Sequence, residues 1–257
     1  MKEAETQNPL IKLTAMQRIV VLIYHNNISN EESDAILMFL IDKTKDQENA
    51  IKIEAFAGIK ALILTNSILE GKLEDILALL LAGIKKPDIG VKIISLEGLI
   101  SLIEKDKLPL EKSEKILKLL LVKVKNANVD IKTRSLLGIQ KLIEKNKVPN
   151  NKLEEIVSIL IMNAQDEESS ISENSLLSIS QLIEQNNLPE SKVTEILKFL
   201  LTITLRGSTS RAKAQAMKCI EVLFKRDRVF EDTTGEIFNL FLEGAIDEIS
   251  TIKKKPP

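Results

Sequence analysis

A phrase of eight residues returns along this chain every 40 residues, and this period limits the possible folds more than any other feature. Three copies read LIEKDKLP, LIEKNKVP and LIEQNNLP, and they begin at Leu102, Leu142 and Leu182. Two earlier copies keep the same register, and a last copy beginning at Leu223 is displaced by one inserted residue. A period of this length is typical of chains that stack one small structural unit many times.

The residues before each phrase follow the pattern of a helix with one apolar face. In one unit the apolar or small residues are Val91, Ser95, Gly98, Leu99 and Leu102. Spacings of three and four residues put these side chains on the same face of a helix. The same columns return in the other units, which indicates that this face packs in the same way each time.

Small residues form one of these columns. Its members from the second unit onward are Gly58, Gly98, Gly138, Ser178 and Cys219. Because glycine inside a helix costs about 1 kcal/mol relative to alanine, its repetition needs a structural reason. We expect a neighbouring helix to cross at this point, and we expect the single cysteine to serve packing there.

A more uniformly apolar helix is predicted after each phrase, for example EDILALLL at 74–81 and EKILKLLL at 114–121. We call it the first-type helix of a unit, and the helix with the small-residue column the second-type helix. A helix that is apolar nearly all round is predicted to be buried on several sides. Pro109, Pro149 and Pro189 are predicted to be the first residues of first-type helices, where proline loses no hydrogen bond. The eight-residue phrase therefore contains the end of one helix, a tight turn and the start of the next helix.

The second-type segments resemble HEAT repeats, whose second helix carries the pattern V-[KR]-x-x-A-x-x-A-[LI]-x-x-L. Here the pattern appears as VKIISLEGLISL at 91–102 and IKTRSLLGIQKL at 131–142. The resemblance implies an all-α fold, a right-handed α-α superhelix of about six helix pairs, with second-type helices on its concave face. We expect a frayed lead at 1–8, one solenoid domain at 9–250 that begins with a half repeat, and a disordered basic and proline-rich tail at 251–257.

Motifs for chemistry are missing from the sequence. His25 is the only histidine and Cys219 the only cysteine, and no phosphate-binding loop, GxGxxG or HExxH motif occurs. We therefore expect no catalytic, cofactor or metal site, and no enzyme. A net charge of −1 argues against a globally basic nucleic-acid binder, and no apolar stretch is long enough for a membrane span. One cysteine cannot form an intrachain disulfide, which favours a cytoplasmic location.

Charge is arranged in blocks along the chain. Residues 105–152 hold 13 basic and 5 acidic residues, a net charge of +8, whereas 153–191 hold 8 acidic and no basic residues. Two interpretations remain: neutralisation between stacked units, or electrostatic registration of an extended partner.

Two groups of basic residues are candidates for partner binding. The first is the column Lys12, Lys52, Lys92 and Lys132, which either holds acidic or phosphorylated groups or covers apolar surface with its side-chain stems. The second is Arg206, Arg211 and Lys213, in and after the segment RGSTSR where the period slips. A helix N-terminus there attracts anions, although the segment is equally compatible with a plain insertion.

The function predicted from these features is a non-enzymatic scaffold or adaptor that binds an extended, acidic or phosphorylated segment of a protein partner. One alternative is a tubulin-binding array of the TOG type, which would use the turns between paired helices, such as KKPDIG at 85–90. Another alternative is a nucleic-acid-binding HEAT-like protein. The absence of tryptophan and the single tyrosine argue against both.

Overall fold

The computed structural model describes residues 8–25, 29–68, 70–206, 209–226 and 235, and these residues form helices and turns only. Its α-helices are α1 (Pro9–Tyr24), α2 (Asn30–Lys43), α3 (Asn49–Leu64), α4 (Leu73–Gly83), α5 (Ile89–Glu104), α6 (Leu110–Lys123), α7 (Val129–Glu144), α8 (Leu153–Asn163), α9 (Ser169–Glu184), α10 (Val193–Arg206) and α11 (Ser210–Lys225). Short 3-10 turns, η2 (Glu70–Lys72), η3 (Asn150–Lys152) and η4 (Glu190–Lys192), precede α4, α8 and α10. The predicted all-α repeat fold is confirmed.

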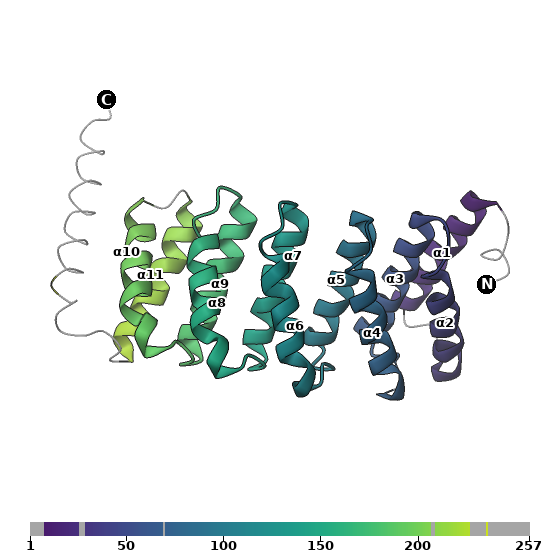
Figure 1. Cartoon of the computed structure of the whole chain (residues 1–257), viewed down its shortest axis with the longest axis horizontal. Helices are drawn as coiled ribbons and strands as arrows, with labels where there is room; N and C mark the ends of the chain where they lie inside the picture. Colours follow the sequence, from purple (N-terminus) through teal and green to yellow (C-terminus); the bar gives the residue numbers. More distant parts are fainter. Residues whose placement is uncertain (1–7, 26–28, 69, 207–208, 227–234, 236–257) are drawn as a thin grey trace, which may run out of the picture. The chain divides into compact units, whose positions relative to one another are not determined.

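Helix contacts divide the chain into two compact units, residues 1–147 and 148–257. In the first unit, α3 packs against α1 and α5, and α5 also packs against α7 (Figure 1). The first-type helices α2, α4 and α6 pack on α3, α5 and α7 respectively. In the second unit, α8 packs on α9, α10 packs on α11, and α9 contacts α11. Each pair therefore consists of a first-type helix and the second-type helix that follows it.

The repeated phrase encodes the same helix ending in every described copy. Asn66, Asp106, Asn146 and Asn186 have positive φ angles of 53° to 59°. In the third copy, the backbone N–H of Asp106 donates to the carbonyl of Ile103, and that of Lys107 donates to Leu102 at 2.9 Å. This is the Schellman pattern, in which a left-handed residue closes the helix, and Asn and Asp tolerate that conformation better than most residues.

The glycine column marks a close approach between paired helices, as the sequence predicts. A Cβ atom on Gly58 would lie 2.8 Å from Leu40, and one on Gly98 would lie 2.6 Å from Leu80. At Gly138 the corresponding distance to Leu120 is 3.0 Å. In each pair the leucine of the first-type helix lies against the glycine of the second-type helix.

The prediction that first-type helices are buried on several sides is wrong. In α4 the buried residues are Ile76, Leu77, Leu80 and Gly83, whereas α5 is buried along most of 91–103. Val122 of α6 and Met162 of α8 are 67% and 58% exposed. The reason is that an internal second-type helix such as α3 or α5 packs against its partner and against two further second-type helices, while a first-type helix is covered mainly by its partner.

The prolines precede first-type helices and are not their first residues, so this prediction is also wrong. Pro109 is the N-cap of α6 in an extended conformation, with φ −60° and ψ 139°. Pro149 and Pro189 precede η3 and η4, and the α-helices begin only at Leu153 and Val193. An extended N-cap residue does not require its own N–H for the helix, so proline fits there as well.

Some expectations fall on residues outside the described ranges. These are most of the lead expected at 1–8, the tail expected at 251–257 and, apart from Gly235, a final helix expected at 231–248. Asn8 is described, and its side chain accepts from the backbone of Leu10 at 3.0 Å and caps α1. The single solenoid domain at 9–250 stays a prediction.

Candidate protein-binding surface

The predicted lysine column lies in the first turns of α1, α3, α5 and α7, all within the first unit. Lys12, Lys52, Lys92 and Lys132 are each partly buried. The ammonium of Lys12 forms an ion pair with Asp46, which lies in the turn between α2 and α3. Lys52 donates to the side chain of Asn49 at 2.9 Å and to the carbonyl of Gln47 at 3.3 Å. The first two lysines therefore also hold the turns in place.

The Lys12–Asp46 pair keeps the Asp46 carboxylate charged. Burial raises the pKa of this carboxyl, but hydrogen bonds from Lys12 and from the backbone of Glu48 outweigh burial and lower the pKa below its ordinary value. Neither side chain is widely accessible, because 18% of Lys12 and 11% of Asp46 is exposed. This pair links α1 to the next repeat.

A polar network crosses three consecutive second-type helices of the first unit. The carboxylate of Glu97 on α5 accepts from Lys60 of α3 at 2.8 Å and from the Nε of Arg134 of α7 at 2.7 Å. Arg134 also donates to Asp130 at 3.1 Å. This network was not predicted from the sequence, although Glu97 lies 37 residues after Lys60 and 37 residues before Arg134.

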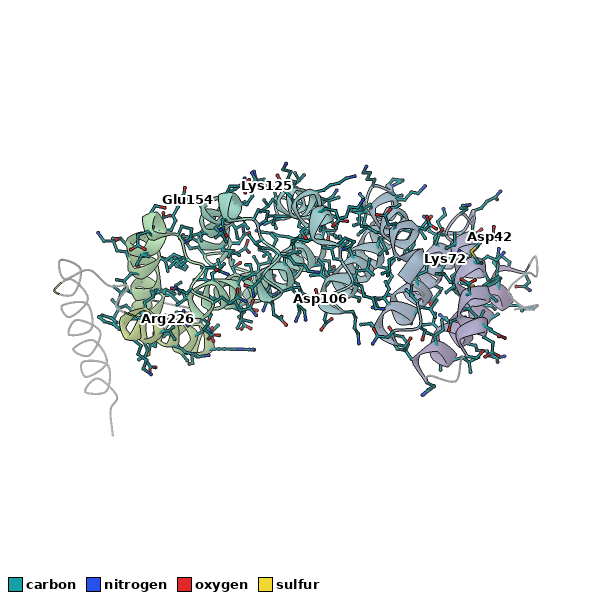
Figure 2. The ribbon with its side chains drawn as sticks, turned by 90° about the horizontal axis from the view of Figure 1, so that it is seen from below. Asp42, Lys72, Asp106, Lys125, Glu154 and Arg226 are labelled. Atoms are coloured by element: carbon teal, nitrogen blue, oxygen red, sulfur yellow. The ribbon has the colours of Figure 1, made fainter. Side chains whose placement is uncertain are left out.

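A second lysine column lies in the turns between paired helices. Lys45, Lys85 and Lys125 repeat at the 40-residue period, and all three are exposed. Their backbone N–H groups make equivalent bonds to the carbonyls of Asp42, Ala82 and Val122. The figures place Lys125 and Asp106 on opposite sides of the first unit (Figure 2). The 40-residue spacing of these lysines is visible in the sequence, but the column was not among the predicted binding residues.

The predicted anion-binding corner is only partly described. Thr209 caps α11 by accepting from the backbone N–H of Ala212 at 3.1 Å. Arg211 forms an ion pair with Glu173 of α9 at 3.2 Å, and Lys213 is partly buried in the first turn of α11. The side chain of Arg206 lies outside the described part of the chain, as do residues 207–208. The structure therefore brings Arg211 to a neighbouring helix and leaves the corner itself untested.

Cys219 lies in the small-residue column and is 1% exposed. Burial raises the pKa of its thiol, against the lowering effect of hydrogen bonds with Ser180 and Gln215. A buried, protonated thiol is consistent with the packing role predicted from the sequence.

Neither a metal-binding cluster nor a membrane-spanning helix occurs among the described residues. Among those residues, no group of three or more His, Cys, Asp and Glu side chains is placed to hold a metal ion. No helix in the same ranges has both the length and the apolar character that crossing a membrane requires.

Comparison with known proteins gives matches in structure only. No family model and no curated protein matches the sequence. An engineered protein matches with a TM-score of 0.61 and 12% identity, over 87% of this chain and 94% of that chain. A computationally designed armadillo repeat protein for modular peptide recognition matches with a TM-score of 0.60 and 11% identity, over 86% and 97%.

An archaeal HEAT-like repeats protein from Thermococcus onnurineus NA1 also matches, with a TM-score of 0.59 and 14% identity, over 87% of this chain and 85% of that chain. By fold, this is a HEAT- and armadillo-like repeat protein. Identities this low show the fold alone, so the binding properties of this HEAT-like chain have to be argued from its own residues.

The HEAT-like repeats combine a constant core with a variable surface. The core column Ile51, Val91, Ile131 and Ile171 is at most 2% exposed throughout. A neighbouring column, partly or fully exposed, changes in size and charge from one repeat to the next. Its members are Ala57, Glu97, Leu137, Leu177 and Lys218. Positions that are free of the core constraint therefore differ between repeats, as a surface that distinguishes partners requires.

Proposed function

We propose that this HEAT-like chain is a non-enzymatic scaffold or adaptor that binds an extended segment of a protein partner along its second-type helices. The observation that carries the proposal is the contrast between the constant core column and the variable, partly exposed column of Ala57, Glu97 and Leu137. Repeat arrays commonly use such extended surfaces for binding. The partner segment is acidic or phosphorylated in this proposal, because Lys52, Lys92 and Lys132 border the same surface.

Three further features bear on the location of the protein and on its partner. The single cysteine suits a reducing compartment, so we place the protein in the cytoplasm. The designed armadillo protein that the fold resembles was made for modular peptide recognition, which makes an extended peptide a reasonable partner for this architecture. Arg211 and Lys213 remain proposed contacts in the second unit, next to Glu173, which already neutralises part of the charge of Arg211.

Photo-crosslinking tests which face is used. A photoreactive amino acid placed at Leu137 reports on the second-type helices, and one at Lys118 of α6 reports on the exposed first-type helices. After incubation with cell extract, we expect specific protein crosslinks from Leu137 that weaken at high salt, and none of these from Lys118. Crosslinks from Lys118 alone, or no specific protein crosslink from either position, would contradict the proposal.

A further inference from the structure

One turn of the first unit departs from the repeat pattern at two positions. The turns between paired helices carry an Asx residue, and the side chains of Asp46, Asn126 and Asp166 accept from the backbone N–H two residues later. The corresponding residue in the second turn is Lys86, followed by Pro87. Lys86 is exposed, and its ammonium group cannot accept a hydrogen bond. This turn therefore has an exposed positive charge at the position where the other turns have an Asx side chain bonded to the backbone.

The second departure is Gly83, the last residue of α4. The equivalent positions in the neighbouring repeats carry Lys43, Lys123 and Asn163. A Cβ atom on Gly83 would lie 2.1 Å from the Oγ of Ser95 and 2.9 Å from the ring of Phe56. Only glycine fits there without displacing its neighbours, because Ser95 and the Phe56 ring occupy the space that a Cβ atom would take. A hollow lies beside this close contact, and Gly83 is part of its lining.

The hollow has a volume of about 300 Å³ and lies wholly within the first unit. Phe56, Leu79, Ala82 and Gly83 form its apolar part, and Lys45, Lys52 and Lys86 are the cations around it. The lining also includes Asp46, which the ion pair with Lys12 neutralises. The site therefore combines an apolar floor with a net positive rim.

We propose that this hollow, which we call the Gly83 hollow, anchors an acidic segment of the protein partner. A side chain with an apolar body fits against Leu79 and Ala82, while carboxylate or phosphate groups next to it lie near Lys45 and Lys86. Exposed Lys85, in the same turn as Lys86, and Lys125, in the equivalent turn of the next repeat, extend this series of cations. The inference rests on the proposed protein-binding function and names a specific position for it.

An anionic polypeptide fits this site better than a nucleic acid. The floor is lined by one phenylalanine that is only 2% exposed, so it offers no open ring on which bases can stack. Lys45, Lys52 and Lys86 line the same small hollow as the apolar side chains of Leu79 and Ala82. Such an arrangement matches the alternation of apolar and acidic residues in a peptide.

Fluorescence anisotropy with defined peptides tests the proposal. The probes are a fluorescein-labelled EEDFEDE peptide, the same peptide with phosphoserine in place of two acids, a neutral SGSFSGS peptide and a short single-stranded DNA. We expect both anionic peptides to bind, the neutral peptide to bind at least about 10-fold more weakly, and binding to weaken as salt shortens the screening length. A preference between the two anionic peptides then identifies carboxylate or phosphate as the natural group.

Matched variants locate the site. Lys45→Glu with Lys86→Glu should weaken the acidic peptide by at least about 10-fold, whereas Lys115→Glu with Lys118→Glu on α6 changes net charge equally and should alter binding by less than about 2-fold. Ala82→Phe, on an exposed position, fills the hollow and should weaken binding by about 5-fold or more, with Ala78→Phe one turn earlier as its control. Circular dichroism confirms that all four variants are folded.

Two results would overturn the proposal: equal loss in both lysine pairs, which indicates unspecific attraction, or tighter binding of the DNA with the same dependence on Lys45 and Lys86. If the crosslinking at Leu137 succeeds and these variants bind normally, the Gly83 hollow fails and the proposed function stands. If no protein crosslinks form, the function fails regardless of the peptide result.

Discussion

The carboxylate of Glu97 accepts from the guanidinium of Arg134 at 2.7 Å, and this bond joins α5 to α7 across a repeat boundary. Lys60 of α3 donates to the other oxygen at 2.8 Å. Burial raises the pKa of Glu97, but the hydrogen bonds from Lys60 and Arg134, with their charges, outweigh burial and lower it below the ordinary value. One carboxylate thus connects three second-type helices of the first unit.

Acid should remove the contribution of Glu97 to stability. Because the folded-state pKa is lowered, the contribution is present above the unfolded-state pKa and is lost as pH falls through the folded-state value. We expect Glu97→Gln to lower the free energy of unfolding by about 1 kcal/mol at pH 7. The difference from the parent chain should shrink in urea melts below about pH 4. The exposed Glu111→Gln serves as control, and a difference at pH 7 that persists unchanged in acid would contradict this account.

Crowding at the glycine column should depend on side-chain size. Leu120 and Ile100 lie 3.0 Å and 3.5 Å from the position of a Cβ atom on Gly138, so Gly138→Leu should destabilise the chain by about 1–3 kcal/mol through overpacking. The exposed Lys115→Leu on α6 should change stability by less than about 0.5 kcal/mol. Urea melts compare the two variants, and equal midpoints would disprove the close crossing of α6 and α7.

The left-handed turn residues should accept glycine and reject β-branched residues. Asn66 has φ 58°, a conformation that glycine adopts freely and valine does not. Asn66→Gly should keep the melting temperature within a few degrees, whereas Asn66→Val should cost about 1–2 kcal/mol. Thermal melts of both variants decide this, and a valine variant as stable as the glycine variant would show that the turn does not need the positive φ.

Cys219 should be protected until its helix opens. Because the thiol is 1% exposed and burial raises its pKa, its reaction with a thiol reagent at pH 8 should be roughly 100-fold slower than in urea. Lys118→Cys in a Cys219→Ala background provides an exposed thiol for comparison, and it should react at nearly the same rate with and without urea. Rapid labelling of Cys219 in the folded chain would mean that the end of the second unit is open there.

The repeat pattern allowed the fold to be predicted because the same columns return at a fixed interval. Gly58, Gly98 and Gly138 predicted close helix crossings, and the structure has them against Leu40, Leu80 and Leu120. The relative burial of the two helix types was not predictable from apolar content, because burial depends on how many neighbours surround a helix. This is why the apolar α4 is less buried than α5.

Less of the candidate binding surface than of the fold could be predicted from the sequence. Lys12 and Lys52 were placed correctly in the first turns of second-type helices, but their partners, Asp46 and Asn49, follow from the folded turns. The Gly83 hollow required side chains from α3, α4 and two turns to be assembled in space. The 40-residue columns identify Lys86 as an exceptional residue, and only the structure shows that it lines a hollow together with Lys45 and Lys52.

Deletion of one repeat tests the central claim, that the chain is a series of helix pairs stabilised by their neighbours. Removing residues 70–109 takes out α4 and α5 in register and brings α3 next to α7. The shortened chain should remain helical by circular dichroism and unfold cooperatively in urea, with a lower free energy of unfolding. Removing only 90–109, which leaves α4 without its partner, should abolish cooperative unfolding. Loss of cooperativity after the in-register deletion, or its survival after the half deletion, would contradict the repeat architecture.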